Sequence, residues 1–246
     1  MSRQELYRFM YSFSIFKYLP LLSGVLLVLC YMDIFFAECE DESVRATQAW
    51  GELGTCFIYI VLMIIVVVAV YIGQEIKNKT LNYEIMRGMS TFRISLAKTV
   101  SCGLFVPIIV IVCFLVYLSI FQAITGKQDL FRLFLIMLVL SHIASVALMF
   151  ILICKNAIIG AIIAFAKFAL IETVFNELAK NIVTENIQQI INKMCVFIQI
   201  NNITMENVST SLVEVALYVI ISFAIEYLLL QCIYYVSANY LFEPGV

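Results

Sequence analysis

Long apolar runs constrain this chain more than any other feature of its sequence. The strongest extends from Ile58 to Ile72 without a charged residue. A helix needs about 20 residues to cross the roughly 30 Å hydrocarbon core of a membrane, and comparable stretches recur along the 246 residues. The chain is 63% apolar and 13% charged, whereas soluble domains are about 45–50% apolar and about 25% charged. So much apolar surface must face lipid, which predicts an integral membrane protein and excludes a water-soluble globule.

Six apolar stretches have the length of a spanning helix and leave no room for a large soluble domain. They cover about 18–37, 53–73, 99–122, 133–154, 157–178 and 213–236. Residues 2–17 place apolar side chains on one helical face, which predicts a helix lying in the membrane interface. No internal repeat or Gly/Ser linker divides the chain. We therefore expect a single all-helical transmembrane domain over residues 1–246.

The basic residues indicate which loops face the cytoplasm. Residues 74–98 hold the densest group of lysines and arginines, whereas residues 38–52 hold only Arg45. The positive-inside rule therefore places 74–98 in the cytoplasm and the 38–52 loop outside. With six spans, both termini are then cytoplasmic. A net charge of −2 is too balanced to indicate a nucleic-acid partner.

The connections between the later spans differ in length. A short outer loop surrounds residues 127–132, and Lys155 and Asn156 form a very short inner turn. Residues 180–212 are long for a loop, yet their apolar residues keep helical spacing, and the apolar stretch 194–200 is too short to span. We expect this segment to form an amphipathic or re-entrant helical element on the outer face.

Residues 74–98 also carry an apolar stripe. The residues that recur at a spacing of three or four are Leu81, Ile85, Met89, Phe92 and Leu96. Gly88 interrupts this pattern, and Ser90 has the side chain of an N-cap for a second short helix. The segment therefore predicts a helix, a break and a helix, whose stripe lies under the membrane or in a groove of a partner protein. A solvated positive-inside loop is the alternative.

The polar residues of this segment follow a recognisable order. Glu75 closes the second span, Lys79-Thr80-Leu81 follows, then Arg87-Gly88-Met89-Ser90-Thr91-Phe92-Arg93, and Lys98 opens the third span. In this order, and in having an interfacial helix, six spans and extra helical matter before the last one, the chain resembles the permease subunits of bacterial ABC-2 type transporters. The small permeases of lantibiotic or bacteriocin immunity and of peptide-antibiotic export are the most similar.

The resemblance implies a function and a set of partners. The segment after the second span would form a coupling helix that seats in a separate ATP-binding cassette ATPase subunit, and two permease chains, identical or homologous, would join two ATPases in the bacterial plasma membrane. ATP and Mg²⁺ would be bound by the partner, since this chain has no GxxxxGK[ST] phosphate loop and needs no cofactor of its own. The expected cargo is an amphiphilic peptide or antimicrobial. The resemblance assigns force transmission to Glu75, Arg87, Gly88, Phe92 and Arg93.

Ionisable residues also occur at membrane depth, where a charge costs about 2.5–3.5 kcal/mol. Lys167 and Glu172 share the fifth span, and Glu226 lies near the middle of the sixth. Residues five positions apart on an α-helix point about 140° away from each other. We therefore do not expect Lys167 and Glu172 to pair well, and expect Lys167 to contact Glu226 instead. His142, the only histidine, is expected to form a hydrogen bond inside the bundle. We expect these four residues to line a translocation path or a permease dimer interface. The alternative is a structural role, with Lys167 and Glu226 as a polar pair and Glu172 extending to the outer interface.

Other functions are less well supported by the sequence. The GxSG and HExxH motifs of membrane proteases are missing from the chain, so we do not expect an enzyme. The alternative function is a non-transporting membrane scaffold or sensor whose basic segment recruits a cytoplasmic partner. Cys39, Cys56 and Cys195 can share one side of the membrane and form a disulfide, but the sequence favours no particular pair.

Overall fold

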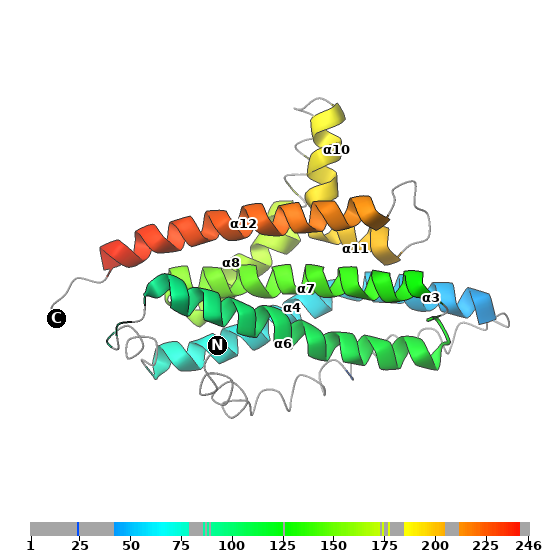
Figure 1. The fold of residues 1–246 in the computed structure, drawn as a ribbon, viewed down its shortest axis with the longest axis horizontal. Coiled ribbons are helices and arrows are strands. Elements are labelled where there is room, and N and C mark those ends of the chain that lie inside the picture. The colour runs from blue at the N-terminus through cyan, green and yellow to red at the C-terminus, as the bar shows by residue number, and fades with distance from the viewer. Residues whose placement is uncertain are drawn as a thin grey trace.

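The structure, a computed structural model, describes residues 24, 42–78, 86, 88, 90–124, 126–172, 174, 177, 185–204 and 212–241. The expected interfacial helix 2–17 and, apart from Gly24, the expected first span 18–37 lie outside this part. Every regular element in the described ranges is helical (Figure 1), which confirms the all-helical expectation there. The elements are α3 (Glu42–Thr55), α4 (Phe57–Lys77), α6 (Thr91–Ile120), α7 (Lys127–Cys154), α8 (Ala157–Ala166), the π-helix η2 (Lys167–Ile171), α10 (Glu185–Met194), α11 (Val196–Thr204) and α12 (Leu212–Leu241).

Four of the described helices are long and apolar enough to cross a membrane. They are α4, α6, α7 and residues Leu212–Val236 of α12. Helices α8 and η2 together form a shorter apolar helix, Ala157–Ile171. The described part of the chain thus provides four of the six expected spans as long helices and the first part of a fifth.

Helix α7 forms the centre of the bundle, with α4, α6, α8 and α12 packed around it (Figure 1). Every residue from Val139 to Met149 is buried, so this helix contacts other helices on all sides. Helix α12 lies at the periphery, where Leu217, Ile221 and Leu228 are each about half exposed. An apolar face of this kind is stable in contact with lipid, as expected for a membrane protein.

The turn between α7 and α8 has the short form that the sequence predicts. Lys155 adopts a left-handed conformation, with φ of 51°, and Asn156 caps α8 by accepting hydrogen bonds from the amides of Ile158 and Ile159. Gly160 then allows the two helices to pack closely, because a Cβ atom at this position would overlap the backbone of Ile151. This turn lies at the end of the bundle where α4 ends and α6 begins, which we call the basic end after Lys77, Lys98 and Lys155.

Two predicted loops are helical instead. Residues 42–52 of the predicted outer loop belong to α3, which ends at Thr55 inside the predicted second span, and α7 already begins at Lys127, inside the other predicted outer loop. Helix α3 buries Trp50, whose indole N–H donates to the carbonyl of Ala123 at 3.2 Å and whose ring lies 5.6 Å from the guanidinium of Arg132. A loop was expected over 38–52 because this segment is rich in charged residues. The apolar side chains of α3 nevertheless form a face that packs on the bundle.

The expected helical element before the last span is present in two parts. Helix α10 runs across the direction of the long helices, and α11 lies beside α12 (Figure 1). Helix α11 is anchored by buried Val196, Ile200 and Ile203. Because α11 packs against α7 as well as α12, the element reaches into the core rather than lying only on its surface.

Candidate functional site

Four ionisable side chains meet inside the bundle and form what we call the intramembrane cluster: His142, Lys167, Glu172 and Glu226. The Lys167 Nζ donates to Glu172 Oε1 at 2.8 Å and to Glu226 Oε2 at 2.6 Å. The His142 Nε2 lies 2.9 Å from Glu226 Oε2. The cluster therefore connects α7, η2 and α12, and the predicted Lys167–Glu226 contact is confirmed.

The prediction that Lys167 and Glu172 do not pair is wrong, and the reason is the π-helix. Residues Lys167–Ile171 form η2, and the amide of Glu172 donates to the carbonyl of Lys167. In a π-turn, residues five apart are hydrogen-bonding neighbours, whereas in an α-helix residues four apart are. The wider turn brings Glu172 over Lys167, which the 140° separation calculated for an α-helix did not allow.

Glu172 also joins a fourth element, α11, to the cluster. Its Oε2 accepts the backbone N–H of Val196, the first residue of α11, at 2.8 Å. A carboxylate at a helix N-terminus satisfies a free amide and interacts favourably with the helix dipole. The single ammonium of the cluster thus neutralises part of the charge of two carboxylates, and the α11 N-terminus and His142 provide the remaining hydrogen bonds.

The cluster lies well away from the basic end of the bundle. Lys167 is ten residues from the start of α8, or about 15 Å from the basic end, which is half of the roughly 30 Å hydrocarbon core. The side chains of Lys167 and Glu172 are 15% and 12% exposed, and that of Glu226 is 29% exposed. Mutual pairing therefore stabilises charges that would each be costly at this depth.

His142 is the most deeply buried member of the cluster, with no exposed surface. Because a carboxylate can only accept, Nε2 carries the proton in the contact with Glu226. The ring packs against Phe168 and Phe223, with centroids 6.1 and 5.4 Å away. The expected hydrogen bond inside the bundle is confirmed, and among the described residues Nδ1 has no hydrogen-bond partner.

At the basic end, three of the residues expected to transmit force, Gly88, Phe92 and Arg93, are exposed. Gly88 has φ of +82°, a left-handed conformation that suits glycine and ends a helix. Ser90 caps α6 by accepting from the amide of Arg93 at 3.4 Å, and Phe92 is 53% exposed. The predicted break and N-cap are confirmed, but the helix that follows is not short, because it continues to Ile120 and is one of the four candidate membrane spans of the described residues. Arg87 lies outside the described residues.

Glu75 and Lys98 meet at this end. The Lys98 Nζ donates to Glu75 Oε1 at 2.5 Å and lies 5.9 Å from the ring centroid of Tyr71. Their side chains are 18% and 13% exposed, so the pair is largely shielded from solvent. The pair ties the last turn of α4 to the second turn of α6, although 23 residues separate the two in the chain.

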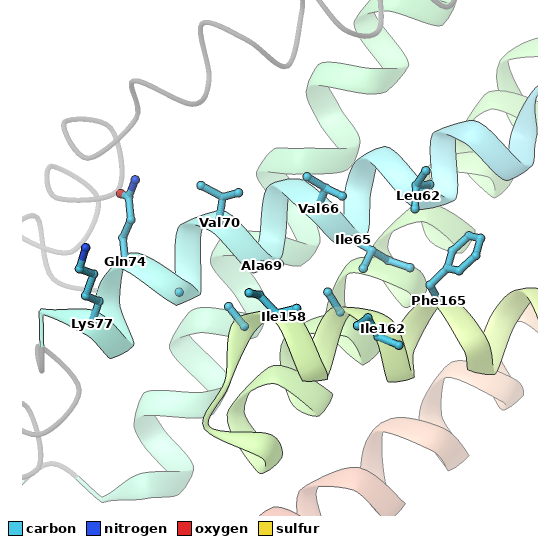
Figure 2. Close-up of a pocket in the computed structure, with 13 residues that line it drawn as sticks. Leu62, Ile65, Val66, Ala69, Val70, Gln74, Lys77, Ile158, Ile162 and Phe165 are labelled. Carbon is cyan, nitrogen blue, oxygen red and sulfur yellow. The ribbon is translucent and has the colours of Figure 1, made fainter.

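An apolar groove of about 620 Å³ runs between α4 and α8. Figure 2 shows Gln74 and Lys77 at one end and Leu62 and Phe165 at the other. Both of these polar side chains are exposed. The groove is lined by Leu62, Ile65, Val66, Ala69, Val70, Gly73, Gln74, Lys77, Ala157, Ile158, Ala161, Ile162 and Phe165.

Sequence reasoning missed a second polar group, which joins α6 to α12. The Gln231 Nε2 lies 3.0 Å from Ser95 Oγ and 2.7 Å from Tyr227 OH, and this hydroxyl donates to Thr99 Oγ1 at 3.2 Å. A glutamine inside a predicted span was the available signal, because a buried amide needs hydrogen-bond partners. The role of the Val196 amide had no sequence signal, since it depends on where α11 begins.

The described residues offer no group of three or more His, Cys, Asp or Glu side chains able to hold a metal ion. Cys56 and Cys195 are both free thiols, so the structure does not contain a disulfide between them, and Cys39 lies outside the described residues.

Neither the family models nor the curated proteins nor the solved structures include one that matches this chain. What the structure itself establishes is that the described part of the chain is all-helical and contains four candidate membrane spans.

Proposed function

We propose that this chain is the permease subunit of an ATP-driven ABC exporter, worked by a separate ATPase subunit through residues 74–98. The observation that carries the proposal is the continuity of α6 from Thr91 to Ile120. Thirty helical residues extend about 45 Å, which exceeds the roughly 30 Å hydrocarbon core. The first turns, with exposed Phe92 and Arg93, can therefore project beyond the membrane while the same helix crosses it.

The contacts at the basic end suit a force-transmitting element. A partner that moves Phe92 also moves the start of the span, because α6 continues without a break from this residue into its apolar part. The Glu75–Lys98 pair passes the same displacement to α4. An exposed aromatic side chain beside a guanidinium is also the residue combination that anchors protein interfaces.

The groove between α4 and α8 is where such a displacement would open a path. The intramembrane cluster holds η2 to α7 and α12, which fixes the helix that continues α8. A tilt of α4 against this fixed helix would widen the groove and admit an amphiphilic cargo, such as a peptide or an antimicrobial. The proposal includes six spans, both termini in the cytoplasm of a bacterial cell, and a second permease chain, identical or homologous.

The proposal is tested by finding whether a gene beside that of this chain encodes an ATP-binding cassette subunit and reconstituting the chain with that subunit. We expect the permease to raise the ATPase rate, and we expect Phe92→Ala and Arg93→Glu to return it to the rate of the ATPase alone while the protein stays inserted. The control is Lys127→Glu, because Lys127 is an exposed residue at the end of α7 that is far from the basic end. This variant is expected to leave the ATPase rate unchanged. If the two variants couple as well as wild type, the assigned role is wrong. If the chain never associates with an ATPase, a scaffold or sensor is favoured instead.

A further inference from the structure

The polar end of the α4–α8 groove collects positive charge. Lys77 lines the groove in the last turn of α4. The close approach of Gly73 to Ala157 brings the N-terminus of α8 to the same end, and a helix N-terminus carries about +0.5 charge. Lys155, two residues before α8, is exposed beside it. None of the residues that line the groove is acidic, so this end favours an anion.

The rest of the groove favours a hydrocarbon chain. From Lys77 to Leu62 it extends over fifteen residues of α4, or about 22 Å, which is more than the roughly 15 Å hydrocarbon depth of one leaflet. All lining side chains beyond Gln74 are apolar. A volume of about 620 Å³ lies within the roughly 300–1,000 Å³ of ordinary ligand sites.

We propose that the groove between α4 and α8 binds an anionic phospholipid of the surrounding membrane, with its phosphate at Lys77 and Lys155 and an acyl chain along Val70, Val66 and Leu62. This inference goes beyond the proposed function, because it concerns the chain at rest and requires neither an ATPase nor transport. A cationic peptide would meet like charge at the polar end, whereas a lipid phosphate meets opposite charge there.

Lipid selectivity tests the proposal directly. The purified full chain is exposed to mixed phosphatidylglycerol and phosphatidylcholine, and the lipids it retains are counted by native mass spectrometry. We expect the wild-type chain to prefer phosphatidylglycerol. Each of the substitutions Lys77→Gln and Lys155→Gln should lower this preference about fivefold. The matched control Lys127→Gln keeps the wild-type preference. Equal retention of both lipids by wild type, or an unchanged preference in the double lysine variant, would overturn the proposal.

A photocrosslinker identifies the occupant of the apolar part. Benzoylphenylalanine replaces Val70, which lines the groove and is 42% exposed, and in a second sample it replaces Ile159, an exposed residue of α8 that does not line the groove. We expect phospholipid adducts at position 70 to be enriched in phosphatidylglycerol, and adducts at position 159 to follow the bulk lipid composition. A main adduct at position 70 with residues 18–37 of the same chain, or with a second copy, would assign the groove to that occupant and refute the lipid site.

Discussion

The two charged regions of this protein are built in opposite ways. The intramembrane cluster is closed, because Lys167, Glu172 and Glu226 use one another, the imidazole of His142 and the amide of Val196 as partners. The basic end is more open, because Phe92, Arg93 and Lys77 are exposed there, although Glu75 and Lys98 are joined in a shielded pair. The difference indicates that charge at mid-depth holds the helices together, whereas charge at the basic end is available to partners.

The largest effect is expected from removing the only cation of the closed cluster. Lys167→Met leaves two carboxylates without a counter-ion at mid-depth, and loss of one partner from a buried ion pair costs about 3–5 kcal/mol. Unfolding of the detergent-solubilised protein, followed by circular dichroism, measures this loss.

The neutral triple variant Lys167→Met, Glu172→Gln, Glu226→Gln is the control. It is expected to regain most of the stability, because no unpaired charge remains. A Lys167→Met protein as stable as wild type would show that the cluster does not hold the bundle together.

A smaller and more local effect is expected at the link to α11. Glu172→Ala removes the acceptor of the Val196 N–H, and a hydrogen bond to a charged group contributes about 2 kcal/mol. Hydrogen exchange at Val196 should accelerate about thirtyfold, while the distant amides of α6 change little. If exchange accelerates equally in all helices, the carboxylate stabilises the bundle as a whole rather than the start of α11.

At the basic end, the Glu75–Lys98 pair is expected to couple only weakly to stability, because it lies beside exposed Gln74 and Lys77, where water can reach either charge once its partner is removed. A double-mutant cycle with Glu75→Gln and Lys98→Met should give a coupling energy of about 1 kcal/mol, well below the cost at Lys167. A coupling energy as large as that of the closed cluster would remove the contrast between the two regions.

The smallest effect is expected at a partly exposed pair, Lys193 of α10 and Glu214 of α12, whose charged atoms are 2.5 Å apart. The hydrogen bond with Glu214 raises the pKa of Lys193 above its ordinary value. The ion pair is therefore intact at pH values below the ordinary lysine pKa. It is lost as the pH rises through the raised pKa of Lys193. The pH profile of acylation at Lys193 should shift to lower pH in Glu214→Gln, and an unshifted profile would show that the pair does not persist in solution.

Much of the fold could be predicted from the sequence because apolar runs and basic clusters report directly on lipid and water. The spans that became α4, α6, α7 and α12, the turn at Lys155 and the N-cap at Ser90 follow from hydropathy and local chemistry. The helices of the structure are longer than the predicted spans where a helix continues past its apolar stretch. Helix α6, for example, already begins at Thr91. Helix α3 was missed because its charged residues outweighed the few side chains that it buries.

The candidate site was predictable in its members and not in its geometry. The cost of charge in lipid identifies Lys167, Glu172 and Glu226 in the sequence, and the contact across η2 and α12 follows from it. The Lys167–Glu172 pair depends on a π-helix, which no periodicity in the sequence indicated. The groove between α4 and α8 likewise depends on how closely Gly73 approaches Ala157, a tertiary property.

The central claim is that a cytosolic motor works this protein through its basic end, and membrane sidedness tests it most directly. Arg93→Cys is treated with a membrane-impermeant maleimide in intact cells and in inside-out vesicles, against the parent chain as background. The account predicts labelling of position 93 in the vesicles only. Labelling of this position in intact cells would place Phe92 and Arg93 on the outside, where an ATP-driven subunit cannot reach them.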